Sequence, residues 1–266
     1  MAISILLYSG LALLAAGTAF LLRPPGFLGI ATRLHALAVA AAGLAAAVTA
    51  LALPPPAART RAREAGARID DFAPEFQFEE FHERLVHATP EAVDRAIRSV
   101  PASEIALFRL LTWIRNPART WNGQGEGILN PPSGRPILEV ALSSGFVLLS
   151  DEPGREIVLG TLVARPPGAR LAVPGDPAET ARRFAALSAP GYAKAAMNFR
   201  IEPLDGGTCR VTTETRVFTT DARTARRFAT YWRFILPGSS LLRVTWLGAI
   251  AARAERPATR EGSPLR

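Results

Sequence analysis

Lysine, cysteine and acidic residues are scarce or unevenly placed in this sequence. Lys194 is the one lysine among 31 basic residues, and Cys209 is the one cysteine. A single cysteine excludes an internal disulfide framework and fits a reducing compartment. The net charge of +8 is spread along the chain rather than gathered in the dense basic patch of a nucleic-acid binder. We therefore expect no nucleic-acid partner.

Acidic residues are absent from residues 1–56, which we assign to a membrane anchor. Ile3 to Leu22 is a run of 20 residues without a charge, and Leu34 to Leu53 is a second, interrupted only by His35. About 20 apolar residues in a helix cross a bilayer core of about 30 Å. A cleavable signal peptide is the alternative for the first run, but no basic residue precedes it. The sequence therefore predicts two transmembrane helices.

Arginine placement predicts the orientation of this hairpin. Four arginines follow the second span and two lie in the connecting loop: Arg59, Arg61, Arg63 and Arg68, against Arg23 and Arg33. The positive-inside rule then places both termini in the cytoplasm. We expect a multi-pass protein of the cell (inner) membrane with a cytoplasmic soluble domain. Residues 57–75, rich in proline, alanine and arginine, are assigned to a basic juxtamembrane linker.

The soluble part opens with a strand that passes directly into a helix. "FQFEEFHERLVHA", starting at Phe76, alternates as a strand does, and neither of its faces is purely apolar, which is typical of a sheet edge. Thr89 is a natural N-cap and Pro90 suits the first helical position. Beyond Pro101, "SEIALFRLLTWIR" predicts a second helix that is apolar almost all round and therefore buried.

Antiparallel strands are predicted next. "DEPG" separates two apolar runs as a hairpin turn, and "DPAETARRFAAL" fits a short helix. A later hairpin turns at "DGG", which pairs Leu204 with Thr208. The same register places Glu202 opposite Arg210, Arg200 opposite Thr212, Asn198 opposite Glu214, Ile201 opposite Val211, Phe199 opposite Thr213 and Met197 opposite Thr215. One face is thus charged and the other mostly apolar, so we expect a sheet with one wet side.

The C-terminal region is predicted to cover the apolar side of the sheet. Thr220 or Asp221 can cap a helix that Pro237 should break or kink. Its apolar face is opposed by Arg223, Arg226, Arg227 and Arg233. Because Arg233 and Arg243 interrupt it, this region is not expected to be a third membrane span.

This order of elements resembles a known superfamily. "LVHATPEAVDRAIRSV", the hairpin "NFRIEPLDGGTCRVTTETRV" and the terminal "FATYWRFILPGSSLLRVTWLGAI" are similar to the SRPBCC (START/Bet v1-like, polyketide cyclase-like) superfamily. The chain departs from it at Asp94, where many members carry an aromatic residue, and in its membrane hairpin. The resemblance implies an α+β helix-grip fold over residues 76–256, an antiparallel sheet wrapped around the C-terminal helix, followed by a flexible tail at 257–266.

Few residues suggest chemistry. His82 and His87 face opposite sides of a strand, so they cannot share a metal ion. Cys209 lacks a recognisable base, and Glu214 and Arg216 fit solvated or ion-paired roles on the polar face. Gly123, Gly125 and Gly127 are followed by two prolines and preceded by no predicted strand, so we do not expect them to form a phosphate-binding loop. We therefore assign no catalytic residue, no metal site and no cofactor.

The resemblance implies an apolar cavity between the sheet and the terminal helix. The residues predicted to line it are Trp113, Phe146, Met197, Phe199, Thr213, Thr215 and Trp246. We favour membrane-tethered binding of a lipid-like or other hydrophobic small molecule, with that ligand and the bilayer as partners. A cyclase/dehydratase-type enzyme with a polar dyad in the cavity, and a structural protein with a filled core, are the alternatives.

Topology can be measured by cysteine accessibility on a Cys209→Ser background. If both termini are cytoplasmic, a membrane-impermeant maleimide added outside intact cells labels a cysteine near Gly26 and leaves one near Ser263 unlabelled. Labelling only near Ser263 would reverse the orientation.

Overall fold

The computed structural model describes residues 1–25, 29–30, 32–60, 67–115, 131–132, 134–169, 171 and 175–256, with the helix backbone alone for 113–115. The chain forms two compact units. The first contains Met1–Pro56 and Ala225–Pro237, and the second contains Ala57–Thr224 and the chain from Gly238 onward. Each unit is described by itself below.

Two apolar helices form most of the first unit. α1 (Ala2–Leu22) and α2 (Arg33–Ala52) pack through small residues at their contact. A Cβ atom added to Gly43 would lie 2.3 Å from the backbone nitrogen of Leu14, and one added to Gly17 would lie 2.4 Å from that of Ala40. Glycine at these positions therefore permits close backbone approach, as at many helix contacts in membranes. By length and composition both helices could span a bilayer.

The second unit is built on a five-stranded antiparallel sheet with the order β3-β7-β6-β5-β4. The strands are β3 (Phe78–Val86), β4 (Val147–Glu152), β5 (Glu156–Ala164), β6 (Ala193–Pro203) and β7 (Cys209–Thr219). A short pair, β1 (Arg59–Thr60) and β2 (Glu75–Phe76), forms a separate ladder. The first long strand lies at the edge of the sheet, as its mixed faces predicted.

The passage from strand to helix follows the sequence signals. α3 (Pro90–Ser99) begins with proline in its first turn, and the Thr89 hydroxyl accepts a hydrogen bond from the amide of Ala92 at 3.4 Å. The next helix is shorter than predicted: a 3-10 turn, η3 (Ala102–Glu104), precedes α4 (Phe108–Arg115). Leu107 between them has a left-handed φ of 60°, which non-glycine residues rarely adopt.

The expectation that this second helix is buried all round is wrong. Leu107 and Leu110 are 49% and 50% exposed, whereas Phe108 is only 2% exposed. Phe108 alone of these three faces the core. The other predicted helix, α7 (Pro177–Ala186), is present, and Asp176 caps it by accepting a hydrogen bond from the amide of Glu179.

The register predicted for the late hairpin is confirmed. Arg200 pairs with Thr212, Ile201 with Val211, Glu202 with Arg210 and Met197 with Thr215. The Leu204 amide donates to the Thr208 carbonyl at 2.8 Å, and Gly206 and Gly207 in the turn η4 (Asp205–Gly207) have φ angles of 71° and 72°. Glycine adopts these left-handed backbone angles without the steric cost that a side chain would add.

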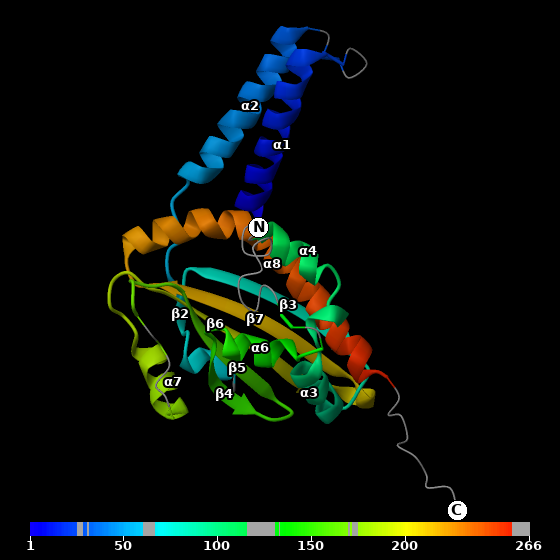
Figure 1. The fold of residues 1–266 in the computed structure, drawn as a ribbon, viewed down its shortest axis with the longest axis vertical. Helices are drawn as coiled ribbons and strands as arrows, with labels where there is room; N and C mark the ends of the chain where they lie inside the picture. Colours follow the sequence, from blue (N-terminus) through cyan, green and yellow to red (C-terminus); the bar gives the residue numbers. More distant parts are fainter. Residues whose placement is uncertain are drawn as a thin grey trace, which may run out of the picture. The chain divides into compact units, whose positions relative to one another are not determined.

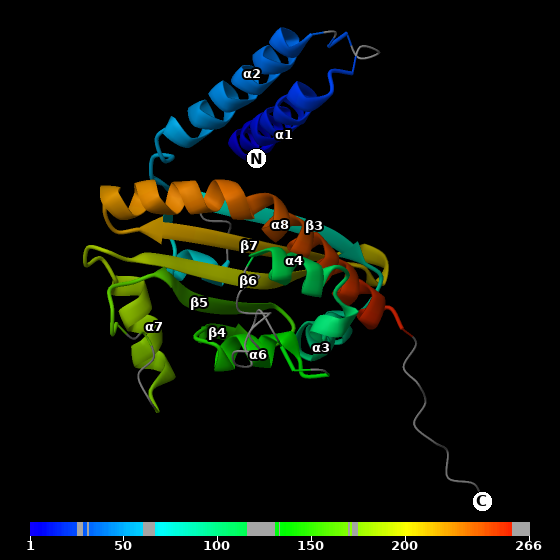
Figure 2. The same ribbon diagram turned by 45° about the horizontal axis from the view of Figure 1, so that its top comes forward.

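Helices cover one face of the sheet and give the helix-grip arrangement (Figures 1 and 2). α3, α6 (Ile137–Ser143) and the Gly238–Ala254 part of α8 (Ala222–Ala254) share a continuous core with the strands. Its members from the strands and α8 include Ile157, Met197, Phe199, Val211, Trp246 and Ile250. The α+β fold expected from the sequence is thus confirmed.

The opposite face of the sheet is not wet along its whole length, which corrects the sequence expectation. The chain from Ala67 to Ala73, including the 3-10 turn η2 (Arg68–Asp71), packs with α7 over this face. Ile69 and Phe184 are both completely buried there. Part of the stretch assigned to a linker therefore belongs to the folded unit.

Arg216 lies at the centre of this covered region and is only 2% exposed. Its guanidinium donates to the Glu214 carboxylate at 2.6 and 3.2 Å, to the Asp70 carboxylate at 2.6 Å and to the Ala73 carbonyl at 3.1 Å. It also lies 5.0 Å from the centre of the Phe76 ring. The ion-paired role expected for Glu214 and Arg216 is confirmed, but the pair is buried rather than solvated.

The start of the C-terminal helix follows its prediction: Asp221 caps it through the amides of Arg223 and Thr224, both at 2.9 Å. The helix assignment continues through Pro237, so of the two outcomes expected there, a break or a kink, the break does not occur. Arg233, expected on the solvent side, is only 5% exposed.

By length and composition α8 could also span a membrane, so its arginines do not exclude a third span on those grounds. Its second half is instead packed in the sheet core: Trp246, Leu247 and Ile250 are at most 3% exposed.

Removing the Arg216 side-chain charge should be costly. Arg216→Met leaves the buried carboxylates of Glu214 and Asp70 without their partner, and we expect a loss of about 3–5 kcal/mol in the free energy of unfolding. The matched control is Arg210→Met, because the exposed Arg210–Glu202 pair should contribute at most about 1 kcal/mol. Urea unfolding of the detergent-solubilised full-length protein, followed by near-UV circular dichroism, measures both. Equal effects would contradict this interpretation.

Candidate functional site

A polar cluster lies between the edge of the sheet and the second half of α8. β3 contributes Glu80 and His82, which stand opposite Thr215 and Thr213 of β7 in the strand register. Alternation along β3 points these side chains to the same face as the buried Phe78 and Val86. The cluster therefore occurs on the face of the sheet that is otherwise apolar.

Glu80 is the centre of the cluster and is only 6% exposed. Its carboxylate accepts hydrogen bonds from the Ser239 hydroxyl at 2.7 Å and from the His82 Nε2 at 3.0 Å. Burial would raise the pKa of this carboxyl, but the hydrogen bond from His82, the charge of Arg243 and the serine hydroxyls outweigh it and hold the pKa below its ordinary value. Glu80 is thus an ionised carboxylate at neutral pH, with its partners supplied by α8 and its own strand.

Arg243 joins this cluster to the apolar core. Its guanidinium donates to the Thr215 hydroxyl at 3.1 Å and lies 5.5 Å from the centre of the Trp246 ring. Trp246 in turn makes an edge-to-face contact with Phe199 at 4.9 Å between ring centres. The Trp246 ring is 3% exposed, and its indole Nε1 has no hydrogen-bond partner in the described part of the chain.

The residues predicted to line a cavity are only partly brought together here. Met197, Phe199 and Trp246 are buried in one packed core, and Phe146 is a half-buried residue at its border. The Thr213 hydroxyl donates to the Asn198 carbonyl at 2.8 Å, so its proton is engaged within the sheet. Thr215 lies in the polar cluster, and the side chain of Trp113 lies outside the described residues.

Four members of the cluster were not selected from the sequence: Glu80, His82, Ser239 and Arg243. A signal for the first two was present, since the alternation of β3 places them on the face of Phe78 and Val86. A carboxylate on the covered face of a strand needs partners from the element that covers it. The partners on α8 are far away in sequence, Ser239 being 159 residues from Glu80.

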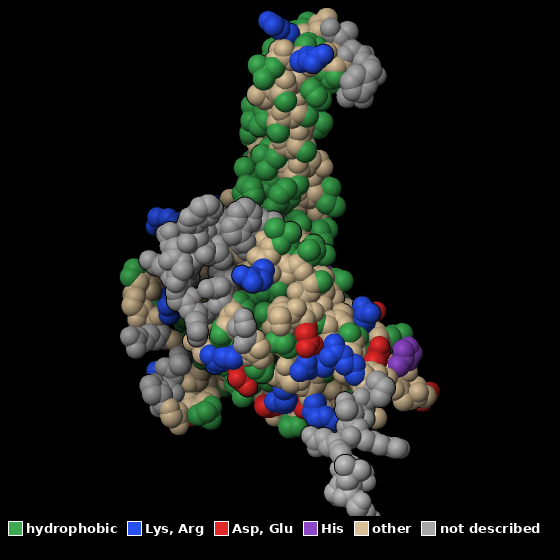
Figure 3. Space-filling model, turned by 45° about the vertical axis from the view of Figure 1, so that its right-hand side comes forward, with side chains coloured by type: hydrophobic (Ala, Val, Ile, Leu, Met, Phe, Trp, Pro, Cys, Tyr) green, Lys and Arg blue, Asp and Glu red, His purple; other side chains and the backbone are tan. Residues whose placement is uncertain are grey.

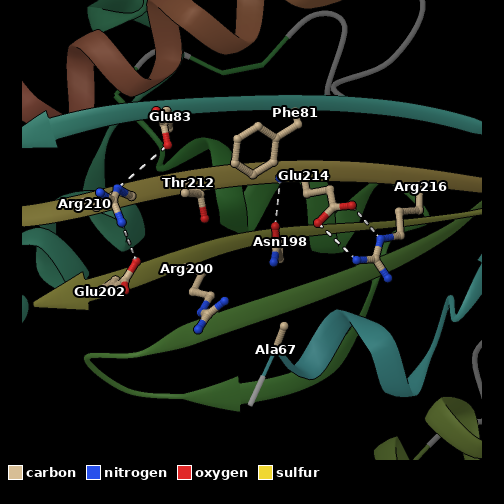
Figure 4. A pocket seen from close by; sticks show the side chains of 10 residues that line it. All are labelled: Ala67, Phe81, Glu83, Asn198, Arg200, Glu202, Arg210, Thr212, Glu214 and Arg216. Carbon is tan, nitrogen blue, oxygen red and sulfur yellow. Dashed lines mark hydrogen bonds and ion pairs between the residues drawn. The ribbon is translucent and has the colours of Figure 1, made fainter. Parts of the chain in front are cut away.

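A pocket of about 130 Å³ opens on the other face of the sheet (Figure 4). Arg210 lies between Glu83 and Glu202, and Glu214 pairs with Arg216. Asn198 beside them donates to Glu156 and accepts from the Glu214 amide, both at 2.8 Å. The lining contains three arginines and three glutamates, Arg200, Arg210, Arg216, Glu83, Glu202 and Glu214, so its formal charges balance. We interpret it as a notch in a structural ion network.

Comparisons with known proteins give a likeness of fold only. No family model matches the chain, and no curated protein matches it. Among solved structures, the chain is similar to the aromatase/cyclase Zhui from Streptomyces sp. R1128, with 14% identity, a TM-score of 0.26, and 67% of this chain and 94% of that chain covered. It is also similar to protein MLL2253 from Mesorhizobium loti, with 15% identity, a TM-score of 0.30, and coverage of 66% and 96%.

A third similar structure is the hypothetical protein jhp0584 from Helicobacter pylori, with 12% identity, a TM-score of 0.32, and coverage of 74% and 99%. These TM-scores are low, so the fold assignment rests on the order of elements and the sheet described above.

Glu80 should make the stability of the protein sensitive to acid. Because its pKa is lower in the folded than in the unfolded chain, its contribution is fully present above the unfolded pKa of about 4.3 and is lost as the pH falls through the lower folded pKa. Glu80→Gln should lower the free energy of unfolding by about 1.5–3 kcal/mol at neutral pH and by less at about pH 3. Glu202→Gln on the exposed hairpin is the matched control. If the free energy of unfolding changed with pH in the same way for the wild type and Glu80→Gln, the lowered pKa assigned to Glu80 would be wrong.

Proposed function

We propose that this protein is a membrane-anchored helix-grip module that reversibly binds an amphipathic small molecule between its sheet and the second half of α8. The apolar part of the ligand would lie against the aromatic core, and its polar end would meet the cluster around Glu80 and Arg243. The observation that carries this proposal is the Nε1 of Trp246, which has no hydrogen-bond partner among the residues that the structure describes.

A buried indole N–H without an acceptor costs about 1–3 kcal/mol, and native proteins rarely leave one so. Replacing Trp246 by another apolar residue would avoid that cost. Its presence beside Phe199 and Arg243 is explained if a ligand supplies the missing acceptor. A few polar groups within a mainly apolar lining are the usual composition of small-molecule sites.

The charges of the cluster favour an uncharged polar group on the ligand. Glu80 is ionised, and Arg243 offsets its charge from the neighbouring turn of α8. A second carboxylate near Glu80 would be repelled, and a cation would compete with Arg243. A carbonyl, ether or hydroxyl oxygen can accept from Trp246 without disturbing this pair. We therefore expect the ligand to be lipid-like with a neutral oxygen near one end.

The membrane anchor supports a hydrophobic ligand. On the face seen in Figure 3 the hairpin surface is apolar along its length, with basic side chains at the tip. Spanning helices would hold the ligand site close to a reservoir of hydrophobic molecules and raise their effective concentration. Within this proposal the protein is a multi-pass inner-membrane protein with a cytoplasmic helix-grip domain.

Trp246→Phe tests the proposal most directly, because it removes the N–H and keeps an aromatic ring. Affinity for a pyrene-labelled long-chain methyl ester should fall about 2- to 10-fold, the value of one neutral hydrogen bond. Affinity for a pyrene-labelled alkane of equal length should fall by less, because only the ester can accept a hydrogen bond from the indole, and unfolding should stay cooperative. Titration of the detergent-purified full-length protein by fluorescence measures both affinities.

Two further variants complete this experiment. Trp232→Phe, outside the cluster, is the matched control and should alter neither probe. Thr215→Trp should occlude the proposed site beside Arg243 and abolish binding while unfolding stays cooperative. Absence of binding by the wild type, or equal weakening of ester and alkane by Trp246→Phe, would overturn the proposal in favour of a structural protein with a filled core.

An enzyme of the cyclase or dehydratase type is the second candidate, favoured by the Glu80–His82 pair. A carboxylate that binds one ring nitrogen of a histidine orients the ring, as in many general acid–base sites. His82 is partly accessible, with 18% of its side chain exposed. If His82 is catalytic, His82→Gln should abolish turnover while binding of the ester probe persists. Equal product formation by His82→Gln and the wild type would contradict this catalytic role and leave reversible binding as the proposed function.

A further inference from the structure

We infer that the first half of α8, Ala225–Pro237, is an interfacial helix that lies in the headgroup layer of an anionic bilayer. It belongs to the same compact unit as the hairpin of α1 and α2. The inference rests on the membrane anchoring proposed above, and the experiment below separates the two.

Contacts place this half of α8 at the end of the hairpin where α2 terminates. The Arg233 guanidinium donates to the carbonyl oxygens of Leu51, Leu53 and Pro54 at 3.0, 2.6 and 3.2 Å. The Tyr8 hydroxyl of α1 donates to the Phe234 carbonyl at 2.7 Å. Both helices of the hairpin thus contact the same stretch of α8.

Arg233 supplies hydrogen-bond donors to carbonyl groups at the end of α2. The last carbonyls of a helix have no partner within the helix, and they carry the negative end of its dipole. Carbonyl oxygens that are buried from water without a hydrogen-bond partner lower stability. Arg233 is buried and binds the carbonyls of Leu51 in the last turn of α2, of Leu53 at its C-cap and of Pro54 just beyond it. It therefore satisfies the end of α2 and places a positive charge at the negative end of the helix dipole. This fixes the helix at the level where α2 leaves the membrane.

The exposed surface of this helix matches lipid headgroups. Tyr231 and Phe234 are 37% and 40% exposed, and Arg226 and Arg227 are exposed as well. Aromatic side chains are enriched at the membrane–water interface, and basic residues close to an anionic surface are attracted to it. α8 contains no acidic residue. Charge complementarity therefore identifies an anionic lipid surface as the partner.

Environment-sensitive probes on the full-length protein test this inference. Single cysteines on a Cys209→Ser background are labelled with NBD after Thr230→Cys in the helix, Glu83→Cys on the sheet and Leu13→Cys in α1. The protein is placed in nanodiscs of phosphatidylcholine, with or without phosphatidylglycerol. We expect a blue-shifted emission at position 230, quenched by shallow but not by deep spin-labelled lipids. The position-83 probe should stay water-exposed, and the position-13 probe should be quenched by deep lipids.

Two added variants test the roles of the arginines. The double variant Arg226→Gln/Arg227→Gln should lose the extra quenching that phosphatidylglycerol gives at position 230. Arg233→Gln should release the helix and shift the position-230 emission to the red, whereas Arg210→Gln on the sheet should change nothing.

The outcomes separate the two proposals. A water-exposed probe at position 230 together with a deeply quenched probe at position 13 would overturn the interfacial helix alone. Failure of lipid quenching at position 13 would overturn the membrane anchoring and the inference with it. Red-shifted emission at position 230 with Arg210→Gln would also count against the helix, since it would show that any loss of charge has the same effect.

Discussion

The second unit depends on the buried hydrogen bonds and ion pairs of the Arg216 guanidinium. An arginine can be removed from water only if its charge is balanced and its N–H groups find acceptors. Glu214 supplies two acceptors from the same strand, while Asp70 and Ala73 come from the chain that leads out of the anchor. Because all must be present together, this segment is fixed on the sheet, and Ile69 and Phe72 can then cover its outer face.

Glu156 extends the same principle to the backbone. Its carboxylate accepts from the amides of Arg68 and Ile69 at 2.8 and 3.3 Å and from Asn198 at 2.8 Å, and Asn198 in turn accepts from the Glu214 amide. The start of η2 is therefore bound to β5 and β6 by a polar chain that also reaches β7. A sequence stretch with the composition of a linker becomes part of the fold because buried side chains of the sheet satisfy its amides.

Local sequence signals predicted the helices, strands and turns, whereas contacts between residues distant in sequence determine the burial and the partners of the charged residues. Thr89 and Pro90, the glycines after Asp205 and the alternation of the late strands act over a few residues, so the helix start, the turn and the register could be read from the sequence. Arg216 meets Asp70 across 146 positions and Arg233 meets Leu51 across 182, and no local pattern identifies either partner. Arginines expected on solvated faces are buried for this reason. Among the candidate site residues, apolar type predicted burial for Met197 and Phe199 but could not tell a packed core from a ligand surface.

The polar cluster under α8 is best understood against these two arginine networks. The Arg216 guanidinium donates to Glu214, Asp70 and Ala73, and the Arg233 guanidinium donates to three carbonyl oxygens. The surrounding structure therefore explains why both arginines are buried. Trp246 differs, because its ring is packed against Phe199 and its N–H finds no acceptor among the described residues. A buried indole without an acceptor lowers stability. Our proposal therefore seeks a ligand on the side of the sheet that faces α8 rather than at the charge-balanced notch on the other face.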